Sequence, residues 1–359
     1  MAARRYRPSV TKPDSPAPPA PVTAADGHRD RPSRRETLVR IGSTAGVLAA
    51  VSALGRAAWD KGGSALAAES RVRQVRDFRV ADGAQAHDAF ADLAIARGGA
   101  LDVPTLATDL VGRAIDALGG MKRFISRGDI VAVKPNIGWD RLPVHAANTN
   151  PDVVGAVIEQ AFNAGAKKVI VADGSCNDPD RCYQRSGIWR KAYALGAEVI
   201  LPAEHRFRTM RMNGEILDEW PIFAALIDVD KVINVPVAKH HNLARFTCGM
   251  KNWYGIVGGR RNRLHQAIDV SIADLATFVR PSLVVIDAIR VLVRNGPQGG
   301  NIDDTRVMNT IVASTDQVAA DAFACTLIGQ HRDNLGYLKV AHERRVGTMF
   351  WENLRVKEA

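Results

Sequence analysis

Short runs of apolar residues alternate with helix-like segments from about residue 128 onward. The runs are rich in β-branched residues and lack polar alternation, which is typical of strands buried on both faces. Because short connections join strands and helices in turn, we expect an α/β fold in which helices flank a mostly parallel sheet. This arrangement is three-layered and Rossmann-like, without a dinucleotide fingerprint. The expected strands are Ile130–Val133, Val169–Ala172, Val199–Leu201, Val232–Val237, Leu283–Ile286 and Thr310–Ala313.

The helical segments carry start and stop signals. Asn150-Pro151 predicts an N-cap with proline at the first helical position, and the apolar face that follows runs from Val153 to Phe162. A second apolar face, from Ile268 to Val279, ends before a proline. Residues 69–127 are expected as a helical lead-in with one helix over 106–118, and residues 128–355 as the α/β domain.

One expected helix carries an isolated acidic residue. The segment Val318–Gly329 is apolar except for Asp321, so burial of the helix would bury one carboxylate. A buried carboxylate needs a partner, because desolvation would otherwise protonate it. Arg290 or a backbone nitrogen is the expected partner, and Asp316 is expected to cap the helix.

The first 68 residues differ in composition from the rest. Pro, Ala and Arg dominate residues 1–32, so we expect this stretch to be disordered. Arg34-Arg35 ahead of the weakly apolar residues 41–55 resembles a bacterial twin-arginine export signal, and Ala65-Leu66-Ala67 offers a cleavage site. The partner during export is then the twin-arginine translocase. The mature protein would be periplasmic or otherwise extracytoplasmic, with no transmembrane anchor after cleavage. The alternative is a basic tail followed by an amphipathic helix.

The formal charge of +10 alone would suggest a nucleic acid or an acidic membrane as partner. Residues 1–68 hold 11 Lys+Arg and 5 Asp+Glu, so +6 of that charge belongs to the leader. Aromatic residues make up 6% of the chain and form no evident platform for stacking bases. We therefore expect no nucleic-acid partner.

Polar residues stand where several expected strands end. Lys134 and Asn136 follow the first strand, Asp173 the second, Lys239 the fourth and Asp287 the fifth. Ligands of open parallel sheets bind at the carboxyl ends of the strands. We therefore expect these side chains to line one crevice.

The stretch from Lys239 to His265 is the densest in basic and polar residues. Lysine and arginine around glycine-rich turns suit a small anionic ligand. Alternatively, His241, His265 and Asp173 are candidate metal ligands. A solvated basic loop is the remaining interpretation. The expected ligand-binding residues are Lys134, Asn136, Asp173, Lys239, Asn252, Arg260 and Arg261.

Three residues are assigned to catalysis. His241 is the expected general acid or base, because an unperturbed imidazole titrates near neutral pH. Asp287 or Asp173 would orient it or share a metal with it, and Lys251 would hold the anion.

The cysteines and the missing motifs exclude several cofactors. No two of the four cysteines form a C-x-x-C pair, so an iron–sulfur cluster or a zinc ribbon is not supported. Cys176 and Cys182 are close enough in sequence to form a disulfide in an oxidising compartment. Dinucleotide, P-loop and zincin signatures are absent. The cofactor stays open, with a metal ion as one candidate.

The order of these short motifs resembles one family, catalogued as domain of unknown function 362, over roughly residues 128–355. His241 matches the family histidine, and His240 stands where the family has threonine. The family's glycine-rich positions that follow are Asn242 and Arg245 here. Many members carry a ferredoxin-like segment, whose cysteines this chain lacks. The motifs that carry the resemblance are Lys134-Pro135-Asn136, Asn150-Pro151, Val171-Ala172-Asp173, Ile233 to His241, Lys251 to Gly255, His265, Val285-Ile286-Asp287, Asn295-Gly296-Pro297 and Asp316 with Asp321.

The family has no settled reaction, so the resemblance implies a fold and a site but no substrate. The function predicted from the sequence is an exported enzyme acting on a small anionic substrate or cofactor, with metal-assisted or redox chemistry left open. The alternative is a non-catalytic extracytoplasmic protein that binds a metal or an anion.

Overall fold

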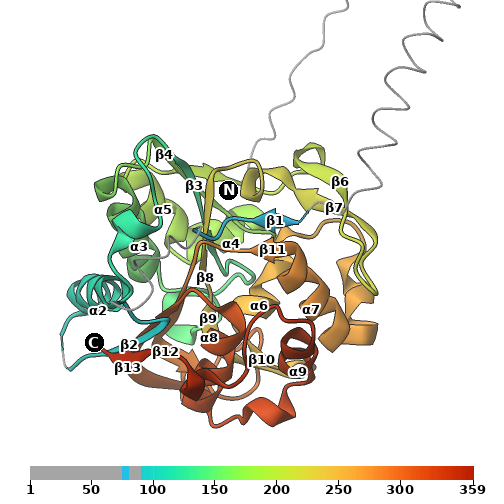
Figure 1. Cartoon of the computed structure of the whole chain (residues 1–359). Helices are drawn as coiled ribbons and strands as arrows, with labels where there is room; N and C mark the ends of the chain where they lie inside the picture. The colour runs from blue at the N-terminus through green and yellow to red at the C-terminus, as the bar shows by residue number, and fades with distance from the viewer. Residues whose placement is uncertain (1–74, 81–89, 100) are drawn as a thin grey trace, which may run out of the picture. The chain divides into compact units, whose positions relative to one another are not determined.

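A mostly parallel sheet runs through the protein, seen in a computed structural model that describes residues 75–80, 90–99 and 101–359 (Figure 1). The expected leader, residues 1–68, lies outside the described residues. The main sheet has the strand order β14-β2-β13-β12-β8-β3-β4-β5. Its strands are β2 (Leu93–Arg97), β3 (Ile130–Pro135), β4 (Lys168–Ala172), β5 (Glu198–Ile200), β8 (Lys231–Val235), β12 (Leu283–Leu292), β13 (Thr305–Ser314) and β14 (Val356–Glu358).

The predicted α/β class with a mostly parallel sheet is confirmed. Among the strands of this path, all neighbouring pairs are parallel except the two that involve β13. The fourth expected strand is divided, because the chain continues past Pro236 as β9 (Val237–His241), which pairs with β12 and with β10 (Arg245–Thr247). Shorter pairs join β1 (Arg76–Asp77) to β11 (Val279–Arg280) and β6 (Phe207–Arg211) to β7 (Glu219–Phe223).

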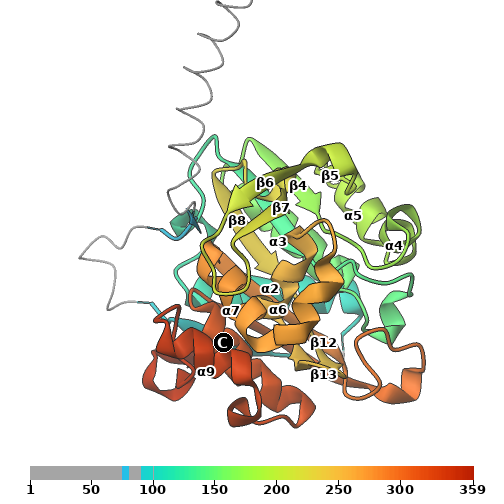
Figure 2. The same ribbon diagram turned by 90° about the vertical axis from the view of Figure 1, so that its right-hand side faces the viewer.

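Helices cover both faces of the sheet, as the three-layer prediction requires. Figure 1 shows α2 (Val103–Ala117), α3 (Pro151–Asn163) and α5 (Ile188–Ala194) on one side of the strands. Figure 2, turned by 90°, shows α6 (Gly249–Asn252) and α7 (Ile268–Phe278) over the other face. In the described residues, the remaining α-helices are α4 (Pro179–Arg185), α8 (Gln317–Ala324) and α9 (Gly336–Glu343).

The strand period of two divides the buried side chains between two cores. Val131 and Val133 pack with α2 and α3 in one core, whereas Ala132 packs with α7 and α8 in the other. Lys134 is the next residue of β3, and a strand that alternates directs its side chain to the face of Ala132. The polar end of β3 thus reaches the same side of the sheet as α6.

The helix ends follow the sequence signals. The Asn150 side chain accepts a hydrogen bond from Asp152 N at the start of α3. Asp316 accepts two, from the nitrogens of Val318 and Ala319, at the start of α8. Both expected N-caps are confirmed.

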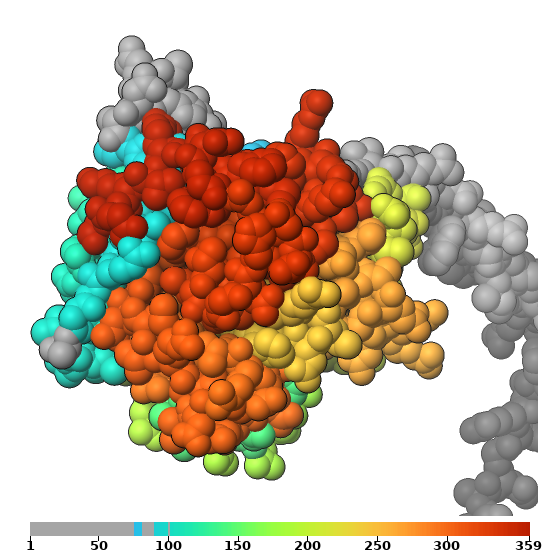
Figure 3. Space-filling view, turned by 90° about the horizontal axis from the view of Figure 1, so that it is seen from below, coloured from blue at the N-terminus to red at the C-terminus, as the bar shows by residue number. Residues whose placement is uncertain are grey.

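The stretch 69–127 is helical only in part. It contains α2, but it also supplies β2, which lies between β13 and β14 in the main sheet. Sequence reasoning missed β2 because its five residues include two alanines, which favour helices. The C-terminal strand β14 pairs with β2 here, and residues of both segments lie on one face (Figure 3). In the part of the chain that the structure describes, no helix combines the length and hydropathy needed to cross a membrane.

Candidate functional site

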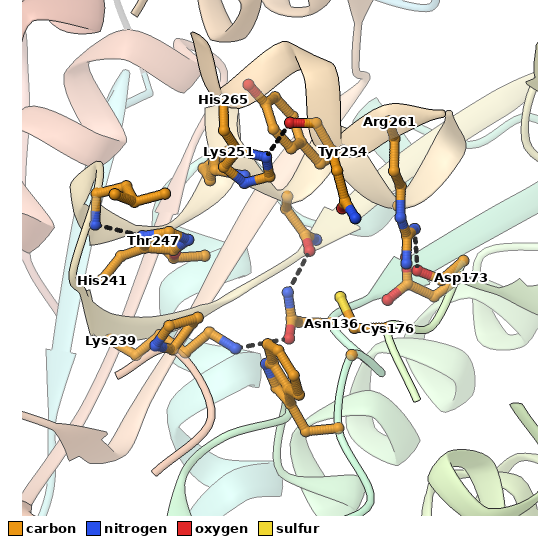
Figure 4. Close-up of a pocket in the computed structure, with 18 of the residues that line it drawn as sticks. Asn136, Asp173, Cys176, Lys239, His241, Thr247, Lys251, Tyr254, Arg261 and His265 are labelled. Atoms are coloured by element: carbon orange, nitrogen blue, oxygen red, sulfur yellow. Dashed lines mark hydrogen bonds between the residues drawn. The ribbon is translucent and has the colours of Figure 1, made fainter. Parts of the chain in front are cut away.

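A cavity of about 570 Å³ lies where β3, β4 and β9 end, beside α6. Figure 4 shows side chains from both walls surrounding one space. The expectation of a crevice at the carboxyl ends of the strands is therefore met by the geometry. Of the residues expected to form it, those that line this cavity are Asn136, Asp173, Lys239, His241, Lys251, Asn252, Arg261 and His265.

Two asparagines connect the sheet to α6. The Nδ2 of Asn252 donates to Asn234 Oδ1 at 2.8 Å, and Asn136 Nδ2 donates to Asn252 Oδ1 at 2.9 Å. Lys239 Nζ then donates to Asn136 Oδ1 at 2.9 Å and to the carbonyl oxygen of Ala147 at 2.5 Å (Figure 4). This chain of bonds fixes the orientation of the Asn136 and Asn252 amides and of the Lys239 ammonium group.

Lys134 and Asp173 form a buried ion pair behind the cavity wall. Lys134 Nζ lies 2.6 Å from Asp173 Oδ1, and Ile137 N donates to the other carboxylate oxygen at 2.6 Å. Burial lowers the pKa of Lys134, and the carboxylate of Asp173 opposes that shift. Asp173 is thus already neutralised and leaves little negative charge for the cavity.

Two glycines allow the backbone to approach this pair. A Cβ on Gly255 would lie 1.8 Å from Asp173 Oδ1, and one on Gly174 would lie 2.6 Å from the Gly255 carbonyl oxygen. Gly174 N donates to that same oxygen at 2.7 Å. Arg261 closes the side of the site by donating to the carbonyl oxygens of Gly174 and Ser175.

Lys251 is buried in the cavity wall without an acidic partner. It is 6% exposed, and its Nζ lies 3.1 Å from the centroid of the Tyr254 ring. Among the described residues, no hydrogen bond or ion pair to that nitrogen is found. Burial lowers the pKa of Lys251 well below its usual value, and the positive charges of Arg261 and Lys239 act in the same direction. The Tyr254 ring favours the charged form only by about 0.5–2 kcal/mol, so burial and repulsion prevail.

Lys239 differs in that it keeps hydrogen-bond acceptors. Burial lowers its pKa to about 7. An amine that titrates there can take up and release a proton near neutral pH, which is the property required of a general acid or base.

His241 lines the cavity, but its surroundings do not favour the general acid or base role expected for it. Its Nδ1 accepts hydrogen bonds from the nitrogens of Leu243 and Ala244 at 3.1 and 3.2 Å, which assigns the ring proton to Nε2. Burial lowers its pKa to about 3, and the charges of Lys251 and Lys239 contribute. His241 is therefore a neutral hydrogen-bond donor, and its pKa lies too low for a general acid at neutral pH.

Two further expected residues lie outside the cavity. Asp287 is buried, and its oxygens accept from Asn150 N at 2.7 Å and Ile289 N at 3.1 Å, so it ties β12 to the start of α3 and does not touch His241. Burial raises its pKa to about 6. Arg260 is exposed, and only Arg261 of the pair lines the cavity.

The candidate metal ligands are not brought together. His241 and His265 are stacked, with ring centroids 6.2 Å apart, but Asp173 is bound to Lys134. Within residues 75–80, 90–99 and 101–359, no group of three or more His, Cys, Asp or Glu side chains is placed to hold a metal ion. A site rich in lysine and arginine also repels a cation, so the donor set does not fit a metal.

The cysteines are free in the described part of the chain. Cys182 is buried, and burial raises its pKa to about 11, whereas Cys176 is exposed and lines the cavity. The disulfide considered from the sequence is not formed.

Several lining residues were missed by sequence reasoning. Thr247, Trp139 and Tyr254 are among them. Thr247 is 4% exposed, and its Oγ1 is buried with no hydrogen-bond partner among the described residues. A single threonine at the end of a three-residue strand gives no signal of its own. Its position opposite Lys239, in the β9–β10 pairing, is the fact that places it in the site.

Asp321 supports the short helix that carries Lys251 and Asn252. Its two oxygens accept from Gly249 N at 2.7 Å and Met250 N at 3.0 Å. Of the two expected partners, Arg290 and a backbone nitrogen, the structure therefore shows the backbone. Arg290 instead donates to Thr305. Burial raises the pKa of Asp321 to about 7. The carboxyl thereby fixes where α6 begins and where its side chains enter the cavity.

The fold and the site together define an α/β protein with a cationic cavity at the carboxyl edge of its sheet. The family described as "Domain of unknown function (DUF362)" matches residues 131–326, more than half of the chain. The chain belongs to this family.

Two known proteins are similar to parts of the chain. The thylakoid-associated protein sll1697 of Synechocystis is 27% identical over 215 residues, which cover 58% of this chain and 65% of that protein. The chain thus spans somewhat less than two thirds of that relative. The lactate racemase apoprotein of Thermoanaerobacterium thermosaccharolyticum shares 13% identity with a TM-score of 0.37, over 68% of this chain and 58% of that one, a likeness too distant to carry an argument.

Proposed function

We propose that this protein is an enzyme that acts on a small organic anion held in the cavity. One observation supports this most strongly: Lys239 and Arg261 line the cavity, whereas its carboxylate, Asp173, is already paired with Lys134. Buried positive charge without a counter-charge is costly. A carboxylate or phosphate group of a ligand would supply the missing negative charge.

The neutral donors complete the proposed binding site. The Nε2–H of His241 and the unpartnered hydroxyl of Thr247 can each hydrogen-bond an anionic oxygen. Because His241 is neutral, its hydrogen bond would orient the anion without adding a further positive charge to the cavity. Lys239 would serve as the proton donor and acceptor, since its pKa of about 7 allows both. An amine that can both donate and accept a proton near neutral pH favours an enzyme over a protein that only binds the anion.

Adjacent arginines give a matched test of the anion site. Replacing Arg261 with Gln should weaken oxalate binding by about 10- to 100-fold, because a hydrogen bond to a charged group is worth about 1.5–3 kcal/mol. Replacing the exposed Arg260 with Gln should change it by less than about twofold, because a solvated charge interacts weakly. Isothermal titration calorimetry of the two variants and the unmodified protein measures both effects. Equal losses in the two variants would remove Arg261 from the site, and no oxalate binding by the unmodified protein would count against the proposal.

We also propose that residues 1–68 direct export through the twin-arginine translocase and that the mature protein is extracytoplasmic. The support is the sequence pattern Arg34-Arg35 ahead of an apolar stretch. Substituting both arginines with lysine should retain the protein in the cytoplasm, whereas substituting Arg4 and Arg5 with lysine should leave export unchanged. Cell fractionation and immunoblotting measure the distribution. Export of the Arg34/Arg35 variant at the normal level would refute this assignment.

A further inference from the structure

Three buried lysines lie in or directly behind the cavity, and their nitrogens have different surroundings. Lys134 Nζ is paired with Asp173 at 2.6 Å. Lys239 Nζ donates to two oxygens, of Asn136 and Ala147. For Lys251 Nζ, the described residues provide the face of the Tyr254 ring and no acceptor. An ammonium group is stabilised in the first two surroundings and is the least stabilised in the third.

We propose that Lys251 is a nucleophile that forms an imine with the carbonyl group of an α-keto or aldehyde acid. This inference rests on the proposed function, since it specifies which organic anions the cavity takes. A desolvated lysine beside other cations is an activated amine. The remaining cationic groups, Lys239 and Arg261, would hold the carboxylate of the same molecule, so that neutral aldehydes are poorer ligands.

The position of Lys251 is fixed from both sides. Its helix begins at Gly249, where Asp321 binds the backbone nitrogens of Gly249 and Met250. The next residue, Asn252, is held by Asn136 and Asn234. Figure 4 shows the Tyr254 ring beside Lys251 at the cavity wall. The amine is therefore presented to the cavity by a rigid turn, as a nucleophile requires.

The reaction balances without a further reagent. The lone pair of the neutral Lys251 nitrogen attacks the carbonyl carbon, and the C=O π electrons move to the oxygen. That oxygen gains a proton and the nitrogen loses one, which gives a carbinolamine. The hydroxyl takes up a second proton and leaves as water, and the nitrogen lone pair forms the C=N bond of a protonated imine. Loss of the remaining N–H proton gives the neutral imine and returns the proton that was taken up. Lys239 is placed in the same cavity to donate and accept these protons.

Cys176 is the competing nucleophile in the cavity, and the product distinguishes the two. A thiol adds to a carbonyl to give a hemithioacetal or hemithioketal, which borohydride does not convert into a stable adduct. An imine of Lys251 is reduced to a secondary amine that survives digestion. Reductive trapping therefore reports on the amine alone.

The test uses the full chain with pyruvate or glyoxylate and cyanoborohydride at neutral pH, followed by intact-mass measurement and peptide mapping. Lys251 should be modified at least about tenfold faster than Lys339, a solvent-exposed lysine outside the cavity. Oxalate, which binds but cannot form an imine, should protect Lys251. Replacing Lys251 with Met should abolish the fast adduct, whereas Lys339→Met should leave it in place. Melting temperatures of both variants control for folding.

Several outcomes would overturn the inference. Modification spread evenly over surface lysines, or fast modification that persists in Lys251→Met, would show that Lys251 is not the nucleophile. If oxalate binds in the calorimetric titration but no fast adduct forms, the imine is refuted and the anion site stands. If oxalate fails to bind as well, both the inference and the proposed function are refuted.

Discussion

Replacing Lys134 with Met should lower the free energy of unfolding by about 3–5 kcal/mol, the cost of leaving one partner of a buried ion pair alone. The Lys134 ammonium lies 2.6 Å from Asp173 Oδ1, and both side chains are at most 3% exposed. Without the lysine, the Asp173 carboxylate remains in a nearly dry site where, among the described residues, only the Ile137 nitrogen donates to it. Urea unfolding monitored by circular dichroism measures the change.

Two further variants isolate the cause. The double variant Lys134→Met/Asp173→Asn removes both charges and should recover a large part of the lost stability, because neutral pairs avoid the desolvation penalty. Lys168→Met breaks the ion pair of Lys168 with Glu198 between the neighbouring strands β4 and β5, where both side chains are 45–48% exposed. It should cost less than about 1 kcal/mol. A loss in Lys134→Met no larger than that in Lys168→Met would contradict the importance of the buried pair.

Replacing Gly255 with Ala should cost about 3 kcal/mol, at the upper end of what overpacking a core costs, and should abolish anion binding. The added Cβ would lie 1.8 Å from Asp173 Oδ1 and 2.8 Å from Lys134 Nζ, so the methyl group and the ion pair cannot share the space. Urea unfolding and oxalate titration of the same variant measure both losses.

Gly99 provides the matched control. A Cβ at that position meets no atom within 4 Å, and its backbone is not in the left-handed region. Gly99→Ala should therefore change the free energy of unfolding by less than about 0.5 kcal/mol. Normal stability and normal oxalate affinity in Gly255→Ala would show that the backbone can move away from the ion pair. The inference that the site has no room for a side chain at residue 255 would then be wrong.

Much of the sheet was predictable because its central strands contain uninterrupted apolar runs. A strand that is buried on both faces can be recognised from its own sequence, without knowledge of the strands beside it. The apolar runs that begin at Ile130, Val169 and Leu283 all form strands. The edge of the sheet that carries the site followed from the parallel arrangement alone. β2 was hidden because its composition favours a helix and its pairing with β13 is distant in sequence.

The roles of individual site residues were less predictable, since they depend on where a strand ends and on what buries it. Asp287 was expected at the end of a strand, but β12 continues to Leu292, so the carboxylate faces the backbone of Asn150. His241 was placed correctly in the cavity, whereas its pKa follows from burial and from two neighbouring lysines. Arg260 and Arg261 are indistinguishable in sequence, and only the turn that contains them directs one inward.

We expect a small organic anion to bind among Lys239, Arg261 and His241, at the carboxyl edge of the sheet. A crystal structure of the protein grown with oxalate tests it most directly. The oxalate carboxylates should lie within hydrogen-bond distance of Lys239 Nζ, the Arg261 guanidinium and His241 Nε2. An oxalate bound elsewhere, with this cavity holding only water at saturating concentration, would contradict it.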